Sequence, residues 1–201
     1  MRMFLRQSTV GREPLAIAMS GVRMGERLLQ IGMDTPVVSG LLAAKPGLSG
    51  ESAMVVPDDA TAVSAKRAAE NAGALVNIRV HALNALPFDR QAFDLVVVHN
   101  REAQLANLGD TRTQALKECR RVIRPGGRII VIDKGTPSGL TAIFQSRKDP
   151  EARALTVKTL EAAGFRSVRP LGDRDGFSFV EGIKAGGAID LAPNDLPKGH
   201  T

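Results

Sequence analysis

The chain has little of the chemistry that cysteine and the larger aromatic residues supply. Among its 201 residues there is one cysteine, Cys119, and there is no tryptophan or tyrosine. A disulfide framework and a multi-cysteine metal site are therefore excluded. Phenylalanine occurs seven times, so few rings are available to stack on bases, which counts against a reader of single-stranded nucleic acid. The core must be built from Val, Ile, Leu and Ala.

Long apolar runs are also missing. No segment approaches the roughly 20 apolar residues that a membrane-spanning helix needs. The first residues, MRMFLRQSTVGRE, lack the apolar stretch of a signal peptide. We therefore expect a cytoplasmic protein without a membrane partner. A metal site is not indicated, because the three histidines, His81, His99 and His200, lack the spacing of a ligand set.

Positive charge is in modest excess and is spread along the chain. The 27 Lys and Arg residues outnumber the 21 Asp and Glu residues, which gives a net charge of +6. The densest cluster is Arg120, Arg121, Arg124 and Arg128. It flanks a predicted helix end and turn, where cations stabilise the carbonyl end of the helix dipole. This structural role is favoured over the alternative, an anion- or RNA-binding face.

Strand and helix patterns alternate along the chain. The predicted strands are 27–32, 52–56, 76–81, 93–99 and 128–133. The predicted helices are 14–22, 36 to just before 46, 59–72, a segment ending before Pro125, and 151–163. A hairpin of 165–171 and 177–184 is predicted around the turn Asp173-Arg174-Asp175-Gly176. This alternation, closed by a hairpin, implies a doubly wound sheet whose final strand is antiparallel.

The most informative segment runs from Ala92 to Asp133. It opens with AFDLVVVHN and closes with ALKECRRVIRPGGRIIVID. Each piece contains a continuous apolar run, Leu95–Val98 and Ile129–Ile132, as expected of parallel strands that are buried on both faces. Cys119 lies on the apolar face of the helix between them, so we expect a buried, inert thiol.

This segment resembles the second half of the class I S-adenosylmethionine-dependent methyltransferases. In that family "FDLV" opens the fourth strand and "LRPGG" turns the chain into the fifth, and the resemblance extends over about Glu26 to Lys184. It implies an α/β fold with a doubly wound, Rossmann-like seven-stranded sheet of order 3-2-1-4-5-7-6 and an antiparallel last strand. We expect one domain over 1–184, with an N-terminal helical extension over 1–25. The Gly/Pro/Asp-rich residues 185–201 are expected to form a disordered tail.

The cofactor site is expected where the strand order reverses, beyond the carboxyl ends of the first and fourth strands. The family's first motif there is acid-x-Gly-x-Gly-x-Gly. The corresponding stretch reads QIGMDTP, in which only Gly32 matches. Gln30 replaces the acid, and Asp34 and Pro36 replace the later glycines. The resemblance implies that Gln30, Gly32, Met33 and Asp34 hold the methionine moiety.

The ribose-binding acid that ends the second strand in the family is also missing. Val56 occupies its position, followed by Pro57, Asp58 and Asp59. Asp58 or Asp59 could reach the ribose edge. Helix capping is the favoured alternative for these acids, with Asp59 as a good N-cap.

A third acid, which contacts adenine in the family, is replaced by Ala82. Leu83 and Asn84 would then flank the adenine ring, with Asn84 either bonded to adenine or acting as a turn residue. Losing one charge-assisted contact costs on the order of 1.5–3 kcal/mol. Three missing acids therefore predict weak or altered S-adenosylmethionine binding. A nicotinamide cofactor is not indicated, because the glycine motif that it needs is absent.

His99 and Asn100 are the first polar residues after the buried fourth strand. They are the candidates for a general base and an acceptor-orienting group. The alternative role of His99 is structural, as a hydrogen-bonding cap of the strand end. Two functions remain open: methyl transfer to an unidentified small-molecule or macromolecular nucleophile, or a catalytically inert partner or scaffold module. In either case a homodimer or a partner subunit could complete the site.

Overall fold

The computed structural model describes residues 15–33, 35–101, 108–109, 111–134, 150–174 and 177–186. The strands are β1 (Arg27–Ile31), β2 (Glu51–Val56), β3 (Asn77–Val80), β4 (Phe93–Arg101), β5 (Ile123–Lys134), β6 (Arg166–Arg174) and β7 (Phe177–Ile183). The helices are α1 (Leu15–Ser20), α2 (Pro36–Ala44), α3 (Asp59–Asn71), α5 (Thr111–Val122) and α6 (Pro150–Ala162). None of these helices is long and apolar enough to cross a membrane.

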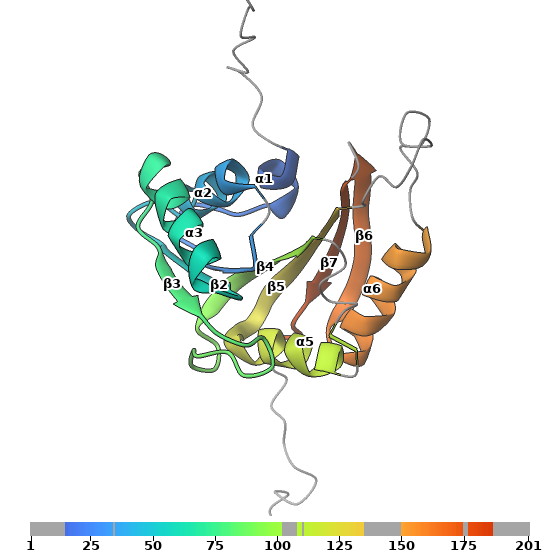
Figure 1. Ribbon diagram of the computed structural model, residues 1–201. Helices are drawn as coiled ribbons and strands as arrows, with labels where there is room; N and C mark the ends of the chain where they lie inside the picture. Colours follow the sequence, from blue (N-terminus) through green and yellow to red (C-terminus); the bar gives the residue numbers. More distant parts are fainter. Residues whose placement is uncertain are drawn as a thin grey trace, which may run out of the picture.

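The strands form one seven-stranded sheet in the order β3-β2-β1-β4-β5-β7-β6 (Figure 1). Strands β1 to β5 pair in parallel, and β7 runs antiparallel to both β5 and β6. The predicted strand order and the antiparallel last strand are therefore confirmed. The expected hairpin is also present, although Asp175 and Gly176 of its turn lie outside the described residues.

Helices cover both faces of the sheet, in agreement with the continuous apolar runs in the sequence (Figure 1). On one face, Leu28, Leu95 and Val97 pack against Ala16 of α1 and Leu42 of α2. On the other face, a second core cluster joins the sheet to α5 and α6. Its members include Leu29, Val96, Ile129, Leu116, Cys119 and Leu160. Because successive strand residues point to opposite faces, each run feeds both clusters.

Several element boundaries differ from the sequence predictions by one to three residues, and the start of β5 differs by five. Strand β5 begins at Ile123 rather than Arg128, because Ile123 already pairs with Phe93. The Pro-Gly-Gly segment that follows is also bonded to the sheet, since the Gly126 N–H donates to the Lys184 carbonyl, 2.9 Å. The N-terminal helix spans only Leu15–Ser20. It supplies Ala16 and Ile17 to one of the core clusters. Residues 1–14 and the predicted tail from 187 on lie outside the described residues.

Strand β3 is one edge of the sheet, and the chain after it crosses to β4 without a helix. Residues 81–92 form turns and bends instead. Strand β3 is largely exposed, and Val80 is 42% accessible. This connection therefore covers the sheet near β3 with a loop rather than with a helix.

Candidate functional site

The predicted site residues lie at one edge of the sheet. In the parallel register Ile31 pairs with both Val55 and Val98, and Val56 pairs with Val80. Gly32, Val56 and His99 therefore all fall at the carboxyl ends of their strands. The strand order reverses between β1 and β4, so this edge is the position where open α/β sheets bind ligands.

The turn after β1 leads directly into α2. Gly32 adopts a left-handed conformation with a φ of 70°, which is accessible to glycine at little cost. Its N–H donates to the Val55 carbonyl, 2.8 Å away. Thr35 caps α2 by accepting a hydrogen bond from the Val38 N–H, 3.3 Å, and Pro36 is the first helical residue. Asp34, expected in this loop, lies outside the described residues.

Gln30 and His99 form a buried pair beneath the edge. Gln30 has no exposed surface and His99 is 2% accessible. The Gln30 Nε2 group donates to the carbonyl of Ser39 in α2, 3.0 Å, so its Oε1 faces the His99 Nε2 atom, 2.9 Å away. Because that oxygen can only accept, His99 carries a proton on Nε2. Both ends of the Gln30 amide are thus used within the protein.

The residues at the end of β2 have two roles: Val56 packs in the core, and Asp58 caps the helix α3. Val56 is 1% accessible and packs with Met54 and Ala65, and Met33 lies against this cluster. Asp58 accepts a hydrogen bond from the Thr61 N–H, 2.7 Å, and this bond is the main reason why its pKa is lowered.

Capping is therefore observed, but by Asp58 rather than by Asp59 as expected. Asp58 has the extended backbone that an N-cap requires, with φ −155° and ψ 165°. Asp59 is already the first residue of α3. An N-cap carboxylate satisfies an N–H group at the helix start, so the residue with extended backbone takes this role.

The turn after β3 presents the third predicted group. Ala82 and Asn84 are exposed, whereas Leu83 is partly buried and packs against the main core cluster. His81 is exposed, and its N–H donates to the Val56 carbonyl, 3.2 Å, which ties the end of β3 to β2.

A second cluster of hydrogen-bonded polar side chains lies at the carboxyl ends of β4 and β5. Asn100, 7% accessible, donates from Nδ2 to Asp133, and Thr156 of α6 donates to the other Asp133 oxygen, 3.1 Å. Asp133 and Thr156 were not predicted from the sequence. Asp133 is the first polar residue after the apolar run of β5, just as His99 and Asn100 follow the apolar run of β4. This shared position was the sequence signal that could have identified Asp133.

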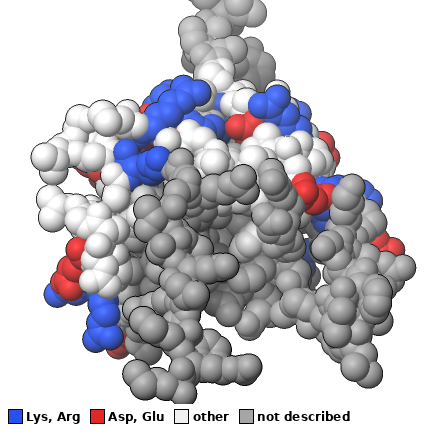
Figure 2. Space-filling view, turned by 90° about the horizontal axis from the view of Figure 1, so that it is seen from above, with Lys and Arg blue, Asp and Glu red and all other residues white. Residues whose placement is uncertain are grey.

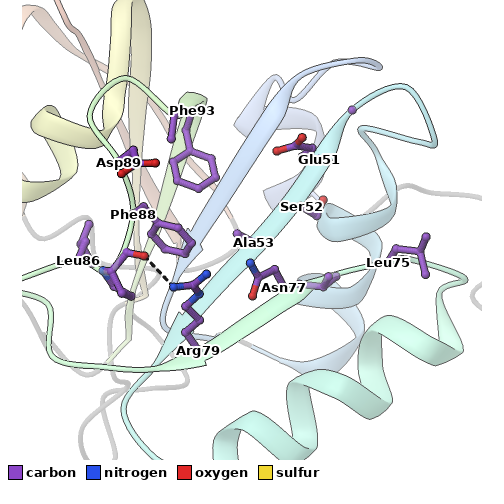
Figure 3. A pocket seen from close by; sticks show the side chains of 14 residues that line it. Glu51, Ser52, Ala53, Leu75, Asn77, Arg79, Leu86, Phe88, Asp89 and Phe93 are labelled. Atoms are coloured by element: carbon purple, nitrogen blue, oxygen red, sulfur yellow. Dashed lines mark hydrogen bonds between the residues drawn. The ribbon is translucent and has the colours of Figure 1, made fainter.

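A groove of about 1010 Å³ lies at the opposite, amino edge of the sheet (Figure 3). Its lining includes Glu51, Asn77 and Phe93, the first residues of β2, β3 and β4. The Arg79 guanidinium stands over the Phe88 ring, 5.0 Å from its centroid, and donates to the Pro87 carbonyl, 2.9 Å. The sequence signal for this groove was the segment before Phe93, in which no helix was predicted.

The four clustered arginines all make structural contacts. Their partners are the Gly164 carbonyl for Arg120, Glu118 for Arg121, Asp94 for Arg124 and Glu26 for Arg128. In the view of Figure 2, the described Lys and Arg side chains alternate with acidic and uncharged surface. Of the four, Arg120 and Arg121 lie in the last turn of α5, where the sequence placed the end of a helix. Cys119 is buried as predicted, and burial raises the pKa of its thiol to about 12.

Comparisons with family models, curated proteins and solved structures all point to methyltransferases. A family model described as "Methyltransferase domain" matches residues 31–131. The ubiquinone/menaquinone biosynthesis C-methyltransferase UbiE of Pseudoalteromonas translucida (strain TAC 125) is 35% identical over 127 residues, which cover 60% of this chain and 47% of that protein. The chain spans about half the length of the curated relatives it matches.

Solved structures share the fold at low sequence identity. The crystal structure of a SAM dependent methyltransferase from Aquifex aeolicus has a TM-score of 0.68 and 18% identity, covering 84% of this chain and 87% of that one. A Haloferax volcanii putative methyltransferase, solved in complex with the Trm112 methyltransferase activator, is also similar. Here the TM-score is 0.60 and the identity 17%, over 87% of this chain and 88% of that chain.

Proposed function

Since this chain belongs to the class I S-adenosylmethionine-dependent methyltransferase family, we propose that it transfers a methyl group from S-adenosylmethionine to a small-molecule or macromolecular nucleophile. The observation that carries the proposal is the family match over residues 31–131. That range includes the ends of β1, β2, β3 and β4, which together form the carboxyl edge of the sheet. The cofactor would supply an electrophilic methyl group on a sulfonium ion.

We further propose that the cofactor is held mainly by backbone groups and therefore weakly. The turn at Gly32 and the capped start of α2 suit the methionine moiety, Pro57 and Asp58 the ribose edge, and Leu83 and Asn84 the adenine ring. The amide of Gln30 is already used by Ser39 and His99, and Val56 is apolar. Each missing charge-assisted contact would weaken binding by roughly tenfold to hundredfold.

His99 and Asn100 are the residues that we propose for the acceptor side of the reaction. His99 would take a proton from the attacking nucleophile on Nδ1, because Nε2 already donates to Gln30, and Asn100, oriented by Asp133, would align the acceptor. The acceptor itself is unidentified. Because the curated relatives are named as C-methyltransferases of ubiquinone and menaquinone biosynthesis, quinol precursors belong in the first panel of acceptors tested.

Calorimetric titration with S-adenosylmethionine and S-adenosylhomocysteine tests the proposal directly. We expect wild-type binding weaker than the low micromolar range, and about tenfold tighter binding by Val56→Asp, since a ribose-binding carboxylate is restored. Val56→Asn is the matched control, with the same shape and no charge. Melting temperatures are needed alongside, because position 56 is buried. Low micromolar binding by wild type, with no gain from the acid, would mean that another residue, most plausibly Asp58, holds the ribose.

Asp58 can be examined separately because its two roles can be uncoupled. Asp58→Ser keeps an N-cap for α3 but removes the carboxylate, whereas Asp58→Ala removes both. If the carboxylate holds the ribose, both variants lose affinity for S-adenosylhomocysteine, but only the alanine variant also loses thermal stability. Full affinity in the serine variant would limit Asp58 to capping.

The second candidate function is a catalytically inert module that acts with a partner subunit or as a homodimer. The observation that favours it is the burial of Gln30 and Val56, which leaves little side-chain chemistry for the cofactor at these two positions. One structural relative has been solved in complex with an activator protein, so a partner subunit is kept as part of this candidate. Absence of any binding of S-adenosylmethionine or S-adenosylhomocysteine, together with absence of methyl transfer to every acceptor tested, would select this function.

A further inference from the structure

The segment Leu86–Phe88 is held by charged side chains of neighbouring elements. The Leu86 N–H donates to Glu118 Oε2, 2.9 Å, and the Leu86 carbonyl accepts from Arg121 Nη2, 2.9 Å. Arg121 Nη1 donates to the Phe88 carbonyl, 2.8 Å, and Arg79 Nη1 donates to the Pro87 carbonyl, 2.9 Å. Every backbone carbonyl of this segment therefore accepts a hydrogen bond from an arginine.

Glu118 and Arg121 lie on one face of α5 and are bonded to each other. The Arg121 Nε and Nη2 atoms each donate to a Glu118 carboxylate oxygen at 2.9 Å. These side chains are only 14% and 26% accessible. The same helix buries Leu116 and Cys119 in the main core cluster, so this pair is anchored on a rigid element.

Among the described residues, the exposed turn Ala82–Ala85 has its main backbone anchors at its two ends. At its start, the His81 N–H is bonded to the Val56 carbonyl, and at its end Leu86 is buried at 5% accessibility and held by Glu118 and Arg121. Between these points Leu83 alone packs against the core cluster. The path of the turn therefore depends on where Leu86 is held.

We infer that Glu118 and Arg121 are positioning residues for the nucleotide half of the cofactor, because they hold the end of the turn that carries Leu83 and Asn84. This inference rests on the proposed function, in which these two residues flank the adenine ring. The pair reaches the ligand only through the backbone of the turn. An arginine is required at position 121, because its planar fork bonds two carbonyls and a carboxylate at once.

The test compares Arg121→Gln, Arg121→Lys and Glu118→Gln with the control Arg120→Gln. Arg120 is adjacent on α5 and also bonds a backbone carbonyl, that of Gly164, but on a different segment. Three quantities are measured on the full chain: the melting temperature, the amide hydrogen exchange of residues 82–88, and the dissociation constant for S-adenosylhomocysteine. The lysine variant keeps the charge and loses the fork.

We expect all three changes at Glu118 and Arg121 to speed amide exchange in residues 82–88 and to weaken S-adenosylhomocysteine binding by about tenfold. The control Arg120→Gln should lower the melting temperature but change neither the exchange nor the affinity. Exchange or affinity that matches the control, while wild type binds the ligand, would overturn the inference alone. A wild type that binds no S-adenosylhomocysteine would overturn the proposed function, and with it the nucleotide role. Rescue of affinity by lysine would show that charge, rather than the fork, is what matters.

Discussion

Gln30 illustrates how a single amide can satisfy a position that a carboxylate cannot. The residue is fully buried, and it must donate to the Ser39 carbonyl while accepting from His99. An ionised carboxylate has no hydrogen to donate, so the Ser39 carbonyl would lose its partner. Burying the charge would itself cost several kcal/mol. The amide at position 30 therefore stabilises the junction of β1, α2 and β4.

The proposed role of His99 gives a prediction at the same scale. If His99 is a general base, His99→Ala should lower turnover by about 10²–10⁴-fold, since a proton acceptor is lost. Methyl transfer to a responsive acceptor measures this effect, with the rate expressed per folded molecule. His81→Ala is the matched control, because His81 directly follows the edge strand β3 and is exposed. A lower melting temperature with an unchanged rate would instead assign His99 a structural role.

Between elements, close approach of α2 and α3 depends on a glycine. A Cβ atom at Gly40 would overlap the carbonyl oxygen of Ala68 and lie 2.8 Å from its carbonyl carbon. The two helices pack side by side on one face of the sheet (Figure 1). Since the obstacle is helix backbone rather than a flexible side chain, the helices can accommodate a methyl group only by moving apart.

Gly40→Ala is therefore expected to destabilise the protein by about 1–3 kcal/mol, the usual cost of overpacking, despite the better helix propensity of alanine. Thermal or urea denaturation measures the loss. Gly186→Ala provides the control, because an added Cβ there meets nothing within 4 Å. Equal stability of the two variants would contradict the close α2–α3 contact.

Ion pairs join the amino ends of the central strands. Asp94 of β4 bonds Arg124 and the Arg27 N–H, and Glu26 bonds Arg128. Burial by itself raises the pKa of Asp94, but the hydrogen bonds from Arg124 and Arg27 and the charges of both arginines outweigh it, so the pKa is lowered. The pKa of Glu26 is lowered in the same way, mainly by Arg128.

A lowered pKa in the folded protein has a defined consequence for acid stability. The pairs stabilise fully above the unfolded-state pKa values, about 3.9 for Asp and 4.3 for Glu, and this stability is lost as the pH falls from there through the folded values. Asp94→Asn should reduce the slope of unfolding free energy against pH below about pH 4. Glu70→Gln, on the exposed side of α3, is the control. A slope equal to that of wild type would exclude a contribution from Asp94.

The molecule as a whole is a sheet with buried central strands and a short, exposed edge strand, β3. Strands β4 and β5 are buried on both faces, whereas β3 is a largely exposed edge strand of four residues. Backbone amides open by local or global unfolding, and those with little apolar cover exchange first. We therefore expect amides of Val96–Val98 and Ile129–Val131 to exchange only with global unfolding.

Amides of Asn77–Val80, by contrast, should exchange faster by local opening. Hydrogen exchange resolved by residue measures both sets in one experiment, so the central strands are the internal control. Protection of β3 equal to that of β4 would show that something covers this edge in solution, such as a second copy or a partner subunit.

The sequence by itself determined the order of elements and the architecture of the sheet. Buried parallel strands need continuous apolar runs, so local pattern was enough for the order of strands and helices along the chain. The order of the strands within the sheet came from the family resemblance that "FDLV" and "RPGG" carry. The replacement of the family's acids at positions 30, 56 and 82 remains a prediction from the sequence. Roles for Val56, Asp58, Asn84, His99 and Asn100 remain predictions.

Only the tertiary structure decided which side chains meet. Gln30 and His99 are 69 positions apart, Asn100 and Asp133 are 33 apart, and Leu86 and Glu118 are 32 apart. Each pair depends on strand register and on how a helix lies on the sheet. The choice of cap between Asp58 and Asp59 depended on backbone angles at the end of β2. Hydrophobic periodicity is a local property of the chain, whereas the pairing of polar groups is settled only when distant elements pack, because each buried group must find its partner there.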